Sequence, residues 1–203
     1  MFFHIQLVDD QATPEKRAQS RQDHWQYFDR YKDHFIARGA TTTDDGVTFL
    51  SSVLFVEFED WRSVRSFVKN EPHNQNGVYK DIRINRWGHG LKPRRQRDFA
   101  REENQLAWYV RGFGKPDMHS KRMELLKGHL DYFQPYDDYH FIVRGGVRSD
   151  DGERWQGSAN LIALPSRGAV QNFLAGEPFY MNGLYESVLV ERYKFGGRPG
   201  QIV

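Results

Sequence analysis

Residues that can transfer protons occur twice in this chain, at nearly the same displacement. Glu71 returns 106 residues later as Glu177, and His24 returns 105 residues later as His129. A histidine can accept or donate a proton near neutral pH, and a carboxylate on its far ring nitrogen fixes the tautomer and stabilises the imidazolium. If the fold brings each histidine to its glutamate, the chain holds two acid–base pairs.

A structural interpretation of the same residues stays open. His24 lies among aromatic residues on one face of an expected amphipathic helix, where a partly buried side chain is common. Glu71 precedes Pro72 and can cap the turn there. Retention of the whole set in both copies favours the catalytic interpretation without excluding the structural one.

Other repeated polar residues are candidates for substrate binding. Ser52 and Ser158 begin corresponding strands, where each hydroxyl can bind a substrate oxygen or the backbone of a strand edge. Tyr79 and Tyr185 suit packing between the copies, although a phenol can also orient a ligand. We therefore include all four residues among the candidate site residues.

The two candidate sites differ at one position. Arg21 stands one helical turn before His24, whereas Leu126 stands at the corresponding position before His129. An anionic or phenolate substrate would then find a cationic partner only in the first copy. We therefore expect the first copy to be the more competent half for an anionic ligand.

The sequence contains no motif for a metal or a cofactor. It lacks cysteine, which excludes disulfides, thiolate zinc sites and cysteine nucleophiles. His34 and His140 form a further repeated pair, but no motif supplies three or four ligands at short spacing. We expect no tightly bound ion and no cofactor.

These residues belong to a longer repeat. Residues 34–39 read HFIARG, and residues 140–145 read HFIVRG. A unit of about 105 residues is far longer than a solenoid repeat, so each copy should be a small domain with its own core. We expect domains at residues 1–89 and 106–198, joined at residues 90–105 by a charged linker with little to bury.

Hydrophobic patterning predicts the same six elements in each copy. In the first copy the first helix begins at Pro14 with Thr13 as its N-cap and runs to about Lys32. The remaining elements of that copy are strands at residues 2–8, 34–38, 49–58 and 78–87, and a helix at residues 61–69. The second copy has strands at residues 106–113, 140–144, 155–164 and 184–195, and helices from about residue 120 and at residues 167–175.

The order strand, helix, strand, strand, helix, strand predicts an α+β fold made of two ferredoxin-like (βαββαβ) repeats. In that arrangement two helices cover one face of a four-stranded antiparallel sheet. The other face would be a bare apolar surface, which acts as an interaction surface. We predict that the two sheets pack against each other as an intramolecular pseudo-dimeric barrel, which leaves further homo-oligomerisation open.

The repeated motifs resemble those of the YCII-related family, whose members adopt the dimeric α+β barrel fold. The motifs of the first copy are Glu15-Lys16-Arg17, Arg21-Gln22-Asp23-His24, Arg38-Gly39, Ser51-Ser52, Glu71-Pro72 and Asn76-Gly77-Val78-Tyr79. Those of the second copy are Lys121-Arg122, Lys127-Gly128-His129, Gly157-Ser158, Glu177-Pro178 and Asn182-Gly183-Leu184-Tyr185. Family members commonly carry Asp before the proline, where this chain has Glu in both copies.

The resemblance implies a small-molecule enzyme. Some relatives eliminate chloride from a hydroxylated ring, and the suggested centre of the family is a histidine paired with an acid. By this resemblance we expect elimination, isomerisation or tautomerisation of an aromatic or cyclic oxygenated compound. His24 and His129 would act as general acid and base, and Glu71 and Glu177 would orient them. The alternative is a non-catalytic small-molecule carrier or sensor.

Composition argues against two other classes of partner. The chain has 29 Lys and Arg against 27 Asp and Glu, a net charge of +2, and the run of arginines in its linker is typical of a solvated surface. No strand carries an RNA-reading motif, so we expect no nucleic-acid partner. The longest apolar run is far below the roughly 20 residues of a membrane span, and the N-terminus lacks a signal-peptide pattern. We expect a cytoplasmic protein without a membrane partner.

Overall fold

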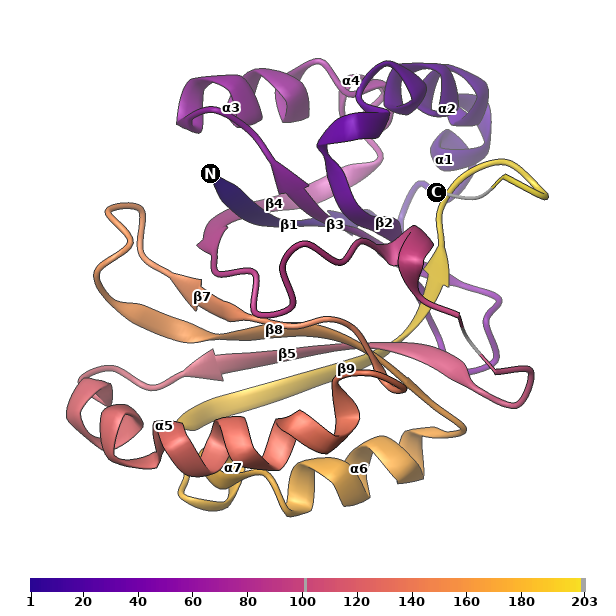
Figure 1. Ribbon diagram of the computed structural model, residues 1–203. Coiled ribbons are helices and arrows are strands. Elements are labelled where there is room, and N and C mark those ends of the chain that lie inside the picture. The colour runs from indigo at the N-terminus through magenta and orange to yellow at the C-terminus, as the bar shows by residue number, and fades with distance from the viewer. Residues whose placement is uncertain (101, 202–203) are drawn as a thin grey trace.

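The two copies form one barrel of antiparallel strands with the helices on its outside (Figure 1). The computed structural model describes residues 1–100 and 102–201. The first copy contains β1 (Phe2–Asp9), α1 (Glu15–Gln19), α2 (Arg21–Arg30), β2 (Phe35–Thr42), β3 (Phe49–Glu57), α3 (Trp61–Lys69), α4 (Pro72–Gln75) and β4 (Tyr79–Trp87). The second contains β5 (Leu106–Gly114), α5 (His119–Phe133), β6 (Phe141–Val143), β7 (Gly146–Arg148), β8 (Trp155–Leu164), α6 (Arg167–Ala175), α7 (Pro178–Met181) and β9 (Tyr185–Phe195). Within these described ranges no helix is long and apolar enough to cross a membrane.

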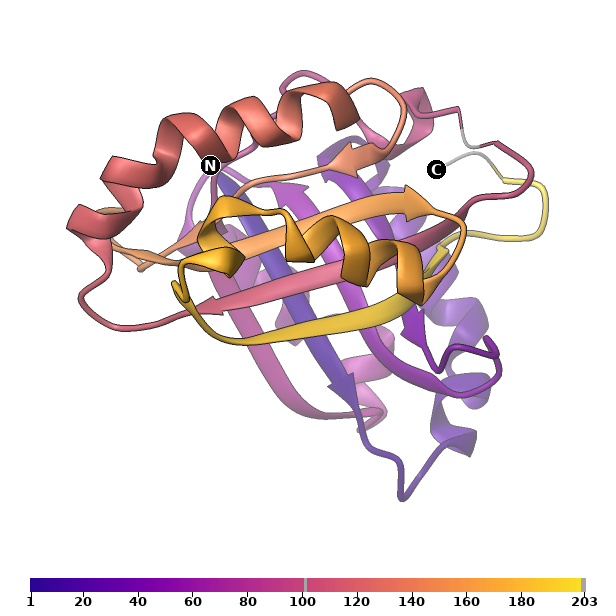
Figure 2. The same ribbon diagram turned by 90° about the horizontal axis from the view of Figure 1, so that it is seen from below.

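The strands close into a barrel through two contacts between the copies. The first sheet has the order β4-β1-β3-β2, and the second has β9-β5-β8 with β6 and β7 both paired to β8. The pairs β2–β9 and β4–β7, which we call the two seams, join the sheets. Because β6 and β7 share one place, the barrel has eight strand positions. Figure 2 shows the two layers of strands crossing. The prediction of an α+β barrel within one chain is confirmed.

Strands near the middle of each sheet are buried on both faces. In β1, Phe3 and Leu7 pack against the helices of the first copy, while His4 points to the other face. A separate apolar cluster between the two sheets includes Val53 and Tyr109, one from each copy. Each sheet therefore covers the face that would be bare in a single copy.

Glycine is required at both seams by the close approach of the two copies. A Cβ atom on Gly39 would lie 2.2 Å from the carbonyl oxygen of Lys194. On Gly145 it would lie 1.7 Å from the carbonyl oxygen of Gly88. No other residue type fits at these positions without moving the backbone, which explains why glycine follows the arginine in both copies.

The first helix differs from its prediction. It is broken at Ser20 into α1 and α2, and Pro14 rather than Thr13 holds the N-cap position. The Thr13 hydroxyl is buried and has no partner among the described residues. The Ser20 hydroxyl donates to the carbonyl oxygen of Lys16 at 2.9 Å, a back-bond that bends helices.

The second strand of copy two, which corresponds to β2 of copy one, is broken into β6 and β7. At the break the backbone N–H of Gly145 donates to the side-chain oxygen of Asn160 at 3.0 Å. The residue at the corresponding position of copy one is Leu54, which has no such acceptor. Asn160 thus supplies the hydrogen bond that a regular ladder would otherwise provide.

The linker was predicted to have little to bury, and this is wrong. The Gln96 side chain is buried and accepts a backbone N–H from β2 at 3.2 Å. Arg94 donates to the carbonyl oxygen of Phe141 at 3.0 Å, and Arg95 donates to that of Phe35 at 2.5 Å. The two arginines satisfy carbonyl groups at the start of β6 and of β2, so the linker is bonded to both copies.

We expect the two copies to stay together when the chain is cut. A protease site inserted between Glu103 and Asn104, which are exposed in a turn, can be cleaved in the folded protein. The two seams and the shared core should keep the halves in one particle, which size-exclusion chromatography would show as a single peak at the volume of the uncut chain. Two peaks of half the mass would contradict the shared barrel.

We also expect stability to fall in acid because of His4. This ring is buried and shares a hydrogen bond of 2.8 Å with the Tyr109 hydroxyl, while burial and the nearby Arg111 lower its pKa well below 6.5. The unfolded chain therefore binds a proton below about pH 6.5 that the folded chain does not bind. The contribution of His4 to stability is therefore complete above that pH. Below it, the free energy of unfolding decreases by about 1.4 kcal/mol per pH unit.

Denaturant unfolding at pH 7 and pH 5 measures this effect. His4→Gln can keep a hydrogen bond to Tyr109 but cannot titrate. The free energy of unfolding of this variant should therefore change less between pH 7 and pH 5 than that of the unaltered protein, and the difference should correspond to about one proton. The same pH dependence in both proteins would show that His4 is not responsible.

Candidate functional site

Each predicted histidine lies next to its predicted glutamate. The Nδ1 atom of His24, on α2, is 2.6 Å from Oε1 of Glu71. The Nδ1 atom of His129, on α5, is likewise 2.6 Å from Oε1 of Glu177. A carboxylate at this nitrogen holds the proton on Nδ1 and leaves Nε2 able to accept one.

Both glutamates also cap a short helix. Glu71 is fully buried, and its two oxygens accept the backbone N–H groups of His73 at 3.0 Å and Asn74 at 2.9 Å. Glu177 accepts the corresponding N–H groups of α7, both at 2.8 Å. The catalytic and structural interpretations of the sequence are therefore compatible, because the helix cap fixes the carboxylate that binds the histidine.

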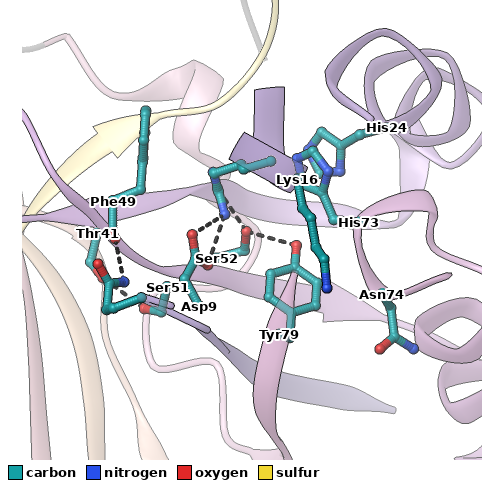
Figure 3. Close-up of polar contacts among 12 residues, drawn as sticks. Asp9, Lys16, His24, Thr41, Phe49, Ser51, Ser52, His73, Asn74 and Tyr79 are labelled. Carbon is teal, nitrogen blue, oxygen red and sulfur yellow. Dashed lines mark hydrogen bonds and ion pairs between the residues drawn. The ribbon is translucent and has the colours of Figure 1, made fainter. Parts of the chain in front are cut away.

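A second histidine, not identified from the sequence, packs on the first pair. The rings of His24 and His73 are stacked, with centroids 4.1 Å apart and planes 8° apart (Figure 3). The Ser20 hydroxyl, which donates to a backbone carbonyl, accepts from Nδ1 of His73 at 2.7 Å. Burial lowers the pKa of His73 to about 2, so the ring is neutral.

Copy two replaces this second histidine by an apolar ring. Phe179 stands 106 residues after His73 and stacks on His129 with centroids 4.0 Å apart. The repeat itself could have revealed His73, because it is one of the few site positions where the copies differ in chemical type.

The predicted serines and tyrosines form matching pairs. Ser52 and Tyr79 share a hydrogen bond of 3.0 Å, shown in Figure 3, and Ser158 and Tyr185 share one of 3.0 Å. Burial raises the pKa of both phenols above the usual value, so both stay protonated. In copy one the serine hydroxyl also accepts from Arg17 at 3.0 Å.

Each histidine lines a pocket at a seam. Pocket one, of about 170 Å³, is lined by His24, Arg21 and Ser52 together with the end of β9 from the other copy. Pocket two, of about 310 Å³, is lined by His129 and Ser158 together with residues 88–90 that follow β4. Both copies therefore contribute to the wall of each pocket. Four predicted site residues are not among the lining residues but contact them, namely Glu71, Tyr79, Glu177 and Tyr185.

The distribution of cations corrects one expectation. Leu126 does replace Arg21 in pocket two, but Arg122 and Arg148 also line that pocket, so copy one is not alone in offering cations to an anionic ligand. The sequence comparison considered a single helix position, whereas Arg148 comes from a strand that only the fold brings to the site.

One arginine of the repeated Arg-Gly motif lines each pocket. Arg144 donates to both oxygens of Asp137, at 2.5 and 2.7 Å. Arg38 is buried, its Nη1 atom has no partner in the described part of the chain, and its Nη2 atom is 3.9 Å from the carboxylate of Asp29. Arg38 therefore adds an incompletely paired cation to pocket one.

The second histidine pair lies outside both pockets. Nδ1 of His34 bonds the carbonyl oxygen of Glu57 at 2.8 Å, and that of His140 bonds the carbonyl oxygen of Ala163 at 3.1 Å. Each thereby ties the start of one strand to the end of its neighbour. The position of His34 and His140 outside the pockets gives no support for a role in ligand binding.

One group of potential metal ligands occurs among the described residues: His24, Glu71 and His73. Both glutamate oxygens accept hydrogen bonds, and both Nδ1 atoms have partners. The two remaining Nε2 atoms belong to nearly parallel rings, so their lone pairs do not converge on one ion. The expectation of no tightly bound metal stays a prediction.

Solved structures share the barrel. Chlorite dismutase from Candidatus Nitrospira defluvii aligns with a TM-score of 0.58 at 9% identity, covering 95% of this chain and 91% of that one. A putative monooxygenase from Lactobacillus acidophilus NCFM aligns with a TM-score of 0.53 at 8% identity, covering 95% and 92%. At such identities the similarity shows a common fold.

A third solved structure is similar to one copy. It is 5-chloro-2-hydroxyhydroquinone dehydrochlorinase from Burkholderia phenoliruptrix AC1100, in complex with 2,5-dihydroxybenzoquinone, at 30% identity. The alignment covers 44% of this chain and 96% of that chain, with a TM-score of 0.42.

Family assignment rests on the sequence of both copies. A search of curated proteins finds no significant match. The YCII-related domain matches residues 1–88 and again residues 108–194, which together are most of the chain. The protein therefore belongs to the YCII-related family and carries the domain of that family twice.

Proposed function

We propose that this protein is a small-molecule enzyme that transfers protons on an aromatic or cyclic oxygenated compound. The supporting observation is the contact of 2.6 Å between His24 and Glu71, which recurs between His129 and Glu177, each at the wall of a pocket. We assign one site to each copy, at residues 1–89 and 106–198.

The chemistry follows from the hydrogen-bonding pattern of the pair. Glu71 is fixed by the helix it caps, so it holds the proton of His24 on Nδ1 and leaves Nε2 as the base. Nε2 takes a proton from the substrate, and the electrons of the broken bond form a double bond as a leaving anion departs or a neighbouring oxygen gains charge. The buried carboxylate stabilises the imidazolium until the proton is returned to the product or to water.

The walls of pocket one support an oxygenated ring as the substrate. Phe28 and Phe49 supply aromatic surface for a flat compound. Arg21 and Lys194 supply positive charge near the histidine, which favours a phenolate or enolate oxygen. Elimination, isomerisation and tautomerisation all pass through such an oxygen anion when the proton leaves a neighbouring carbon.

The test separates turnover from binding. With 5-chloro-2-hydroxyhydroquinone as the first candidate substrate, His24→Ala and His129→Ala should each remove turnover at one pocket, and the double variant should lower the total rate by about 10²–10⁴-fold. Binding of 2,5-dihydroxybenzoquinone, followed by calorimetry, should change little, because the histidines transfer protons rather than anchor the ring.

Glu71→Gln serves as the matched variant within one pair. It preserves the shape and one acceptor of the helix cap but removes the charge that stabilises the imidazolium, so it should lower turnover at pocket one with little change in binding. If a ring compound binds and is converted equally fast by the double histidine variant, the histidines are not catalytic. Binding without conversion in the unaltered protein would favour the carrier or sensor.

A further inference from the structure

Arg122 lies in pocket two without the acidic partner that its counterpart has. In copy one Arg17 donates to both carboxylate oxygens of Asp9 at 2.8 Å. Within the described chain Arg122 forms no ion pair, and its Nε atom is buried without a hydrogen-bond partner. Gly114 takes the place of Asp9, since the two are paired with corresponding tyrosines of the neighbouring strands.

An aromatic wall fills the space around Gly114. A Cβ atom on this glycine would lie 2.7 Å from the Trp155 ring, so no side chain can restore the acid there. Trp155 stands where copy one has Phe49, and the guanidinium of Arg122 is 5.9 Å from its ring centroid. Copy two has thus lost an internal carboxylate and gained a larger aromatic surface.

A second cation without an acidic partner lines the same pocket. Arg148 stands where copy one has Thr42, and the one hydrogen bond of its side chain among the described residues goes to a backbone carbonyl. Repulsion by Arg148 adds to burial in lowering the pKa of Arg122. None of the described residues that line the pocket is acidic. Two unpaired cations in one pocket favour an anionic ligand.

Pocket two has apolar side chains at two positions where pocket one has polar ones. Leu126 and Phe179 occupy the positions of Arg21 and His73. A ligand that fits these walls has an apolar ring and one anionic group, and a volume of about 310 Å³ accommodates a substituted benzene ring. Arginine binds a planar carboxylate through two parallel hydrogen bonds.

We propose that pocket two binds an aromatic carboxylate. Its carboxylate group lies between Arg122 and Arg148 and takes the role that Asp9 has in copy one. Its ring packs on Trp155 and Phe179. The two copies of the domain therefore bind different compounds. This proposal concerns binding alone and holds whether or not the histidines transfer protons.

Calorimetric titration of the full-length protein with benzoate tests the proposal at low salt. Benzoate should bind, and its neutral analogue benzamide should bind at least about tenfold more weakly. Arg122→Gln should weaken benzoate binding by about tenfold to a hundredfold, because it removes a charge-assisted contact. Arg148→Thr, which introduces the residue of copy one, should weaken it less because Arg148 is more exposed.

Arg62→Gln, on the exposed side of α3, controls for the change in net charge and should leave benzoate binding unchanged. Arg122 has no acidic partner to lose, so thermal unfolding of Arg122→Gln should match that of the unaltered chain. No binding of benzoate, or equal binding by Arg122→Gln, would overturn the proposal. So would loss of binding in Arg21→Leu with retention in Arg122→Gln, because benzoate would then occupy pocket one.

Discussion

The structure depends on the mutual burial of two sheets. Each copy covers one sheet face with its own helices, and the apolar residues on the other face have no cover except the second copy. Burial of this shared cluster favours packing of the two sheets, since apolar burial contributes about 25 cal/mol per Å². The seams then follow, because two twisted sheets packed face to face bring their edge strands together.

Closure of the barrel also determines where the two pockets lie. At the two seams the chain needs Gly39 and Gly145 to let the backbones approach, and the neighbouring Arg38 and Arg144 line the pockets. The histidine of one copy faces the strand end of the other. A single copy would hold the histidine–glutamate contact but only part of the pocket wall, which gives a physical reason for pairing two copies of the domain.

The two copies differ mainly in their charged side chains, whereas several contacts of the site are the same in both. The histidine–glutamate contact, the serine–tyrosine hydrogen bond and the capped short helix recur with nearly equal distances. The carboxylates differ: Asp9 neutralises an arginine in copy one, and Asp137 neutralises a different one in copy two. A different arginine therefore remains available in each pocket. The positive charge lies at different positions in two otherwise similar sites.

The repeat, the order of the elements and the pairing of histidine with glutamate could all be predicted from the sequence. The period of apolar residues is local, and the helices at Trp61–Lys69 and Arg167–Ala175 occur at the predicted residues. The pairing could be inferred because two copies kept the same types of residue at corresponding positions.

Which side chains share a pocket could not be predicted from the sequence, because it depends on the fold. The neutral state of His73 depends on its burial, and the missing partner of Arg122 depends on the strand register that places Gly114 opposite Tyr185. The contacts of the linker also escaped prediction, because a charged composition does not reveal which buried carbonyl groups need a donor. Burial, register and closure are long-range properties, and no local pattern of residues encodes them.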